Sequence, residues 1–231
     1  MTALLINAVT IAAGSLIGLL IKSRLSRNVT DTIMVGIGFF TVYIGISGIA
    51  GAEGSVSSIV YLLSVTLGGV IGAVLKIDEK IDKAALKVQN LLTKDGENHF
   101  ATGFTGFFII SFVGAFTLIA SFNAGLGDNT MLITKSVMDL IVSMAMAASL
   151  GIGVLFAGIP ILLCELALVC FAAFLSSVLS APMIEAFSCM GSILTIAIGT
   201  NVTGITDFKV VNYLPALLIA PLLVCLIPLA G

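Results

Sequence analysis

The chain has 231 residues, of which 59% are hydrophobic and only 10% are charged, whereas an ordinary soluble domain carries about 25% charged residues. So few charged groups cannot cover a water-soluble core built from this many apolar side chains. The composition therefore excludes a soluble enzyme, a nucleic-acid-binding module and a disordered protein. The net charge of −2 points to no particular partner. We expect an all-α protein that crosses a membrane many times.

Apolar segments of membrane-spanning length follow one another along the chain. A helix needs roughly 20 apolar residues to cross about 30 Å of hydrocarbon, and by this criterion we predict eight spans. They cover residues 3–21, 32–50, 57–75, 103–122, 131–156, 159–179, 184–203 and 212–230. We place the boundary between the fifth and sixth spans at residues 157–160, because Pro160 suits the first turn of a helix.

A polar segment, residues 76–99, separates the third and fourth spans. Its apolar residues recur at helical spacing, which predicts a helix lying on the membrane surface. We divide the single transmembrane domain accordingly into four parts. These are a first three-helix unit (1–75), a cytoplasmic amphipathic loop (76–100), two linking helices (101–157) and a second three-helix unit (158–231).

The basic residues predict the orientation of the spans. If the N-terminus lies outside the cell, nine of the ten lysines and arginines fall in inner loops, as membrane proteins prefer. These are Lys22, Arg24, Arg27, Lys76, Lys80, Lys83, Lys87, Lys94 and Lys209. Eight spans then place both termini outside, whereas removing one span would move Lys209 to the outer side.

Spans one to three can be aligned with spans six to eight. The alignment pairs Asn7 with Glu165, residues 42–45 with 196–199, and Tyr61 with Tyr213. Five helices separate the starts of the two units, and because this number is odd the units would have opposite orientations, as in inverted-repeat transporters. Apolar helices also align by chance, so the inverted 3+2+3 repeat is a hypothesis.

Three charged residues lie inside the apolar spans. Glu165 is in the sixth span, and Lys135 and Asp139 share one face of the fifth because they are four residues apart. A charge in the bilayer core costs about 2.5 kcal/mol or more, so such residues are functional candidates. Structural alternatives remain open: Lys135 extends to the outer surface, the Lys135–Asp139 pair only joins helices, or Glu165 is protonated and hydrogen-bonded to Asn7 or to the backbone.

The predicted hairpin of spans five and six separates these charges. At 1.5 Å per residue, Asp139 lies roughly 28 Å before the turn at residues 157–160 and Glu165 roughly 9 Å after it. This predicts two clusters, an outer one of Lys135 and Asp139 and an inner one of Asn7 and Glu165. A first span that begins outside would instead place Asn7 closer to Asp139, unless inverted symmetry brings spans one and six together near the middle of the membrane. The two carboxylates meet only if the fifth span is interrupted near its glycines at positions 151 and 153.

A second candidate lies in the seventh span, where two glycines bracket Thr200 and Asn201 within residues 199–204. An unwound polar segment is tolerated at membrane depth where it lines a cavity, although an ordinary glycine-rich helix end has the same pattern. The predicted solute- or ion-binding set is therefore Asn7, Lys135, Asp139, Glu165, Thr200 and Asn201.

Motifs for catalysis or cofactors are missing from the sequence. It contains no HExxH pair, Walker loop, GxSxG elbow or cysteine–histidine metal cluster, so we expect no enzymatic activity, cofactor or resident metal. The spacings Gly14-x-x-x-Gly18 and Gly68-x-x-x-Gly72 predict close helix contacts, within the chain more readily than in a dimer.

Several sequence blocks resemble a known family. They are residues 6–8 with Gly14 and Gly18, and residues 132–139, 148–154 and 212–217. On these blocks the chain resembles the YdfK/YqgA-type bacterial integral membrane proteins, a domain-of-unknown-function family. The resemblance implies a multi-pass protein of the bacterial inner membrane and implies no settled activity.

Four functional hypotheses follow. The first is a small secondary transporter for a small solute or ion, coupled to protons through Glu165 or Asp139. The alternatives are an ion or solute channel, a non-catalytic membrane-embedded binding subunit of a larger uptake complex, and an assembly factor without a cavity. The expected partners are the lipid bilayer, a small solute or ion, and a second copy of the chain in a homo-oligomer; no nucleic acid is expected.

Overall fold

Long apolar segments in lipid have few ways to satisfy their backbone polar groups, and the helix is the simplest. The computed structural model describes residues 2–21, 27–50, 56–80, 83, 99–112 and 115–226, and this part of the chain contains helices, turns and no strand. The protein is an all-α membrane protein, as its composition predicts.

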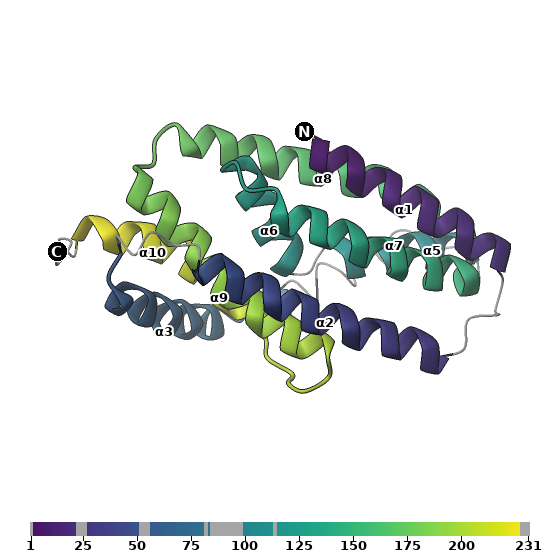
Figure 1. The fold of residues 1–231 in the computed structure, drawn as a ribbon, viewed down its shortest axis with the longest axis horizontal. Helices are drawn as coiled ribbons and strands as arrows, with labels where there is room; N and C mark the ends of the chain where they lie inside the picture. The colour runs from purple at the N-terminus through teal and green to yellow at the C-terminus, as the bar shows by residue number, and fades with distance from the viewer. Residues whose placement is uncertain are drawn as a thin grey trace. The chain divides into compact units, whose positions relative to one another are not determined.

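Figure 1 shows the order of the helices. They are α1 (Thr2–Ile21), α2 (Arg27–Ala50), α3 (Ser58–Val74), α5 (His99–Phe112), α6 (Ala115–Gly125), α7 (Thr130–Leu150), α8 (Gly153–Ser176), α9 (Ala181–Val202), the 3-10 helix η1 (Val210–Tyr213) and α10 (Pro215–Leu226). Among the described residues, α1, α7, α8 and α9 are each long and apolar enough to cross a membrane, and shorter apolar helices accompany them. The predicted surface helix of residues 76–99 lies mostly outside the described ranges.

Local sequence explains where two of these helices begin. The hydroxyl of Ser57 accepts a hydrogen bond from the backbone N–H of Ile59, which caps the start of α3. Pro182 stands in the first turn of α9, where the N–H that proline lacks would have no partner inside the helix.

Two predicted boundaries differ from the structure. The predicted fourth span is formed by two helices, α5 and α6. The turn between the fifth and sixth spans lies at Gly151 and Ile152 rather than at residues 157–160, and Pro160 lies inside α8. Gly151 has φ 84° and ψ −158°, a conformation that glycine adopts almost alone. The glycine, not the proline, therefore ends the fifth span.

The chain forms two compact units. Unit 1 comprises Met1–Ile33 and Ile81–Ala172, and unit 2 comprises Met34–Lys80 and Ala173–Gly231. The three-helix units predicted from the sequence, 1–75 and 158–231, do not coincide with these compact units. Each compact unit contains helices from both predicted three-helix units.

In unit 1, α1 runs alongside α7 in the same direction (Figure 1). Glycines allow the close approach: a Cβ added to Gly14 would lie 2.2 Å from the carbonyl oxygen of Leu140, and one added to Gly18 would lie 2.2 Å from that of Met144. This contact holds α1 beside the charged face of α7. An apolar core packs around it, formed by Ile11, Phe107, Ala147, Val154, Ala157 and Ile161.

In unit 2, α3 packs antiparallel against α10. A Cβ on Gly68 would lie 2.5 Å from the backbone nitrogen of Ala216, and one on Gly72 would lie 1.8 Å from the carbonyl oxygen of Asn212. Both predicted glycine spacings therefore make contacts within the chain.

Candidate functional site

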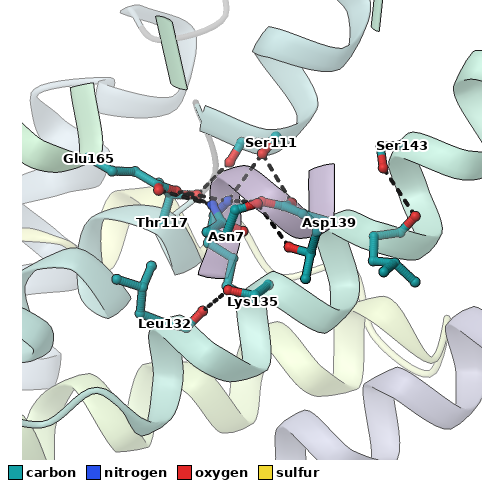
Figure 2. A network of polar contacts seen from close by, with 11 residues as sticks. Asn7, Ser111, Thr117, Leu132, Lys135, Asp139, Ser143 and Glu165 are labelled. Carbon is teal, nitrogen blue, oxygen red and sulfur yellow. Dashed lines mark hydrogen bonds and ion pairs between the residues drawn. The ribbon is translucent and has the colours of Figure 1, made fainter. Parts of the chain in front are cut away.

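Three charged side chains meet between α7 and α8 in unit 1 (Figure 2). The ammonium of Lys135 forms a close ion pair with Oδ2 of Asp139, one turn along α7. The same ammonium lies 3.0 Å from Oε1 of Glu165 on α8. A single lysine thus bridges two carboxylates that belong to neighbouring helices.

Asn7 joins the cluster from α1. Its Nδ2 donates to both carboxylate oxygens of Glu165, at 3.0 Å to Oε1 and 2.9 Å to Oε2. The sequence alignment of the repeat pairs the same two residues, and in the structure they are in direct contact. The amide oxygen of Asn7, Oδ1, is buried and has no hydrogen-bond partner.

Ser111 on α5 completes the network. Its hydroxyl donates to Oδ1 of Asp139 at 3.0 Å and accepts from Lys135 Nζ at 3.1 Å. It stands one residue before the end of α5, and Thr117 in the first turn of α6 donates to the Ser111 backbone carbonyl. Ser111 could not be predicted as part of the site, since a lone serine in an apolar run is a weak signal.

The network is closed off from solvent by the protein itself. Lys135 is 2% exposed, Asp139 5%, Glu165 0% and Asn7 1%. Lys135 therefore points inward rather than extending to the outer surface. Because apolar surroundings strengthen electrostatic interactions and penalise unpaired charges, each of these groups depends on its partners.

The prediction of two separate clusters is wrong, and the position of the turn explains why. With the turn at Gly151 and Ile152, Asp139 lies about 18 Å before it and Glu165 about 20 Å after it, at 1.5 Å per residue. The two carboxylates are therefore level on the antiparallel helices. The interruption near Gly151, named above as the condition for their meeting, is present.

Thr200 and Asn201 lie in unit 2 and are not part of this network. Their helix, α9, continues through Val202 and ends before Gly204, whose φ of 77° favours glycine. The segment is thus an ordinary helix end rather than an unwound span, and residues 45–48 likewise lie within α2.

The side chains of Thr200 and Asn201 hold the loop that follows α9. Asn201 Nδ2 donates to the carbonyl oxygen of Phe208 at 2.7 Å, and its Oδ1 accepts from the Phe208 N–H at 2.9 Å. The Thr206 hydroxyl lies 2.8 Å from both Thr200 Oγ1 and Asn201 Oδ1. These contacts fix the loop between α9 and η1.

A separate polar contact in unit 2 joins two loops. Lys209 Nζ donates to Oδ2 of Asp78 at 2.6 Å, and the Asp78 N–H donates to Oδ1 of Asn212 at 2.9 Å. The hydrogen bond from Lys209 holds the pKa of Asp78 below its usual range. The segment after the predicted third span and the segment after the predicted seventh span therefore meet at this ion pair, which indicates that both segments lie on the same side of the membrane.

The charged network of unit 1 lacks the ligand set of a typical metal centre. Among the described residues, no group of three or more histidine, cysteine, aspartate or glutamate side chains lies close enough together to hold a metal ion. The network instead pairs carboxylates with an ammonium and an amide.

Comparisons with known proteins match almost the whole chain. The family model described as "Protein of unknown function (DUF554)" matches residues 2–225. The "Uncharacterized membrane protein YdfK" of Bacillus subtilis (strain 168) is 28% identical over 227 residues, covering 97% of this chain and 96% of the relative. The "Uncharacterized protein YqgA" of Escherichia coli (strain K12) is 30% identical over 220 residues, covering 93% of this chain and 92% of the relative. No solved structure gives a significant match. The chain belongs to the DUF554 family of membrane proteins.

Proposed function

We propose that the protein is a small secondary transporter in a bacterial inner membrane and that the network around Lys135 is its binding and coupling site. The observation that carries this proposal is a buried excess of carboxylate: Asp139 and Glu165 share one ammonium. Ionisable groups inside membrane helices are costly and mark ion or proton pathways. The proposed activity moves a solute without chemical conversion.

The charge of the network limits what it can bind. With both carboxylates ionised and Lys135 charged, the site carries one net negative charge. A buried negative charge attracts a proton or a small cation and repels an anion. We therefore favour a cation as the solute, or a neutral solute moved together with a proton.

Contacts within unit 2 support an inverted repeat. The alignment pairs Gly45 with Gly199, and a Cβ on Gly45 would meet Ile196 at 2.6 Å, while a Cβ on Gly199 would meet Val42 at 2.7 Å. The alignment also pairs Val42 with Ile196. Exchanging the two repeats therefore turns the Gly45–Ile196 contact into the Gly199–Val42 contact. The contact of Asn7 with Glu165 in unit 1 is of the same kind, because these aligned residues touch each other. Such self-exchanging contacts are expected of inverted repeats in transporters.

Helix directions within each unit support eight spans. In unit 1, α1 and α7 run parallel, as the first and fifth of eight alternating spans would. In unit 2, α3 and α10 run antiparallel, as the third and eighth would. The Lys209–Asp78 ion pair supports placing both of its loops on one side, which we infer is the cytoplasm because lysines gather in these loops. Both termini would then be extracytoplasmic.

Transport is tested with the purified protein in proteoliposomes that contain a pH-sensitive dye. Pulses of lithium, sodium, potassium or choline chloride, and of neutral amino acids or sugars, are applied under an imposed proton gradient. We expect at least one pulse to change the internal pH, and Asp139→Asn and Glu165→Gln to abolish the change. Asp128→Asn is the matched control, because Asp128 is an exposed carboxylate just before α7 and lies outside the network.

The outcomes separate the hypotheses. A saturable pH change that depends on the network supports a carrier, whereas a flux that rises linearly with the gradient would indicate the channel alternative. If no pulse moves protons and the two network variants behave like wild type, the transport proposal is wrong.

A further inference from the structure

Asp139 and Glu165 differ in the partners that stabilise their negative charges. Asp139 has the close ion pair with Lys135 on Oδ2 and the hydroxyl of Ser111 on Oδ1. Glu165 shares the same lysine through Oε1 from a different helix, and its Oε2 has only the Asn7 amide as a partner among the described residues. With one ammonium for two carboxylates, Glu165 is the group whose negative charge is less balanced.

The other charged and titratable groups around Glu165 do not change this balance. From α7 only Lys135 and Asp139 reach the network, and on α8 itself Cys164 is the neighbour in sequence. Helices α1 and α6 carry no titratable side chain, and the only histidine of α5 is its first residue, His99. No second cation is therefore available among the described residues to neutralise Glu165.

The amide oxygen of Asn7, Oδ1, is buried without a hydrogen-bond donor, and this indicates what Glu165 can bind. Asn7 turns its Nδ2 toward both oxygens of Glu165 and leaves Oδ1 buried without a hydrogen bond. A carboxylate offers no donor for that oxygen, but a carboxylic acid does. Rotating the amide so that both its ends face the carboxyl group lets Nδ2 donate to one oxygen while Oδ1 accepts the acidic O–H of the other.

We propose that Glu165 is the proton-binding group of this protein and that Asn7 is its positioning partner in both protonation states. When Glu165 is ionised, Asn7 Nδ2 donates to both of its oxygens, as observed. When it is protonated, Asn7 and Glu165 form a paired amide–acid contact, and Lys135 and Asp139 remain a neutral ion pair beside it. The step forms one O–H bond on Glu165 and breaks one O–H bond of a hydronium ion, which becomes water, and no change of oxidation state occurs.

This proton site deepens the transport function proposed above and rests on it for its role in a cycle. All four side chains are closed off from solvent, so proton exchange requires a conformational step that opens the network to water. A transporter that alternates its access supplies such a step. The proton is then the coupling ion, and the solute moves with it or in exchange for it.

The test is infrared difference spectroscopy of the full-length protein in lipid, titrated over roughly pH 5 to 9, above the range in which exposed carboxyl groups take up protons. We expect a carbonyl-stretch band of a protonated carboxylic acid that disappears as the pH rises. Glu165→Gln should remove the band. Asp139→Asn should keep the band but move its disappearance to lower pH, because Lys135 then has Glu165 as its one carboxylate partner. Asn7→Leu, which removes the paired contact and keeps a similar volume, should shift the frequency of the band and the midpoint of its titration.

A second measurement covers the case in which a variant does not fold. Wild-type protein with carbon-13 in its glutamate side chains should show the isotope shift in this band, whereas label in aspartate should leave it unchanged. The proposal is overturned if wild type shows no titrating acid band, if the band follows the aspartate label, or if Asn7→Leu leaves it unmoved. A glutamate band without any transport would support the proton site and contradict the transporter, while transport without the band would do the reverse.

Discussion

The ammonium of Lys135 on α7 lies 3.0 Å from Oε1 of Glu165 on α8, across a turn that consists only of Gly151 and Ile152. Because the turn is this short, Asp139 and Glu165 lie at nearly equal distances along the chain on its two sides, which brings the charged side chains of α7 and α8 level with each other. Their polar residues meet although both helices are otherwise largely apolar. The position of one glycine thus determines whether the protein has one charged site or two separated groups.

Replacing Gly151 with alanine should destabilise the protein and loosen the site. No neighbouring atom would touch the added Cβ, so the cost is purely conformational, and residues other than glycine in this backbone region lose about 1–3 kcal/mol. Unfolding by denaturing detergent measures the loss. Gly36→Ala is the matched control, because it also adds a Cβ in open space but inside a helix, where alanine is preferred. Equal effects of both substitutions would contradict this account of the turn.

Replacing Lys135 with methionine should be far more damaging, because it leaves two buried carboxylates without a counter-charge. Removing one partner of a buried ion pair costs about 3–5 kcal/mol. The double variant Lys135→Met/Asp139→Asn should recover part of the loss, since the pair is then removed as a whole. Lys209→Met, which disrupts an exposed pair, is the control and should lower the thermal midpoint much less. A double variant no more stable than Lys135→Met would argue against the pairing.

Replacing Gly18 with alanine should separate α1 from α7. The new Cβ would lie 2.2 Å from the Met144 carbonyl oxygen, and backbone atoms cannot move aside cheaply. Overpacking of this kind costs about 1–3 kcal/mol. Since α1 carries Asn7, we also expect any transport that depends on Glu165 to fall. Gly106→Ala is the control within the same unit, because its nearest neighbour is a flexible methionine end at 3.4 Å. Comparable thermal midpoints for the two variants would show that the close contact is unimportant.

The Asp78–Lys209 pair should give stability a measurable pH dependence. The hydrogen bond from Lys209 holds the pKa of Asp78 below its usual range. The carboxylate form is therefore favoured in the folded protein, so its stabilisation is complete above the pKa of the unfolded chain and is lost as the pH falls through the folded value. Thermal midpoints of wild type and Asp78→Asn should differ at pH 7, and the difference should shrink as the pH falls below about 3.9, the ordinary pKa of aspartate. A difference that stays constant with pH would contradict this assignment.

The sequence by itself determined the class of the protein and most of its helices. Composition and span length required a multi-pass helical membrane protein, because too few charged residues are present to cover a soluble core. It also identified Lys135, Asp139 and Glu165, since a charge in an apolar span is costly wherever that span packs. The alignment of Asn7 with Glu165 even anticipated a contact, for aligned residues of inverted repeats can face each other.

Only the tertiary structure decided how these residues meet. The turn between the fifth and sixth spans could lie at Gly151 or near Pro160, and the local sequence favoured the proline. In the structure Pro160 lies inside α8, because neighbouring packed segments allow a proline within a membrane helix. The turn lies at Gly151, whose backbone conformation only glycine adopts easily. The role of Ser111 could not be predicted from the sequence either, because it also depends on tertiary contacts. A serine becomes part of a site through the groups brought near it, and here those groups come from a helix about 24 residues further along the chain.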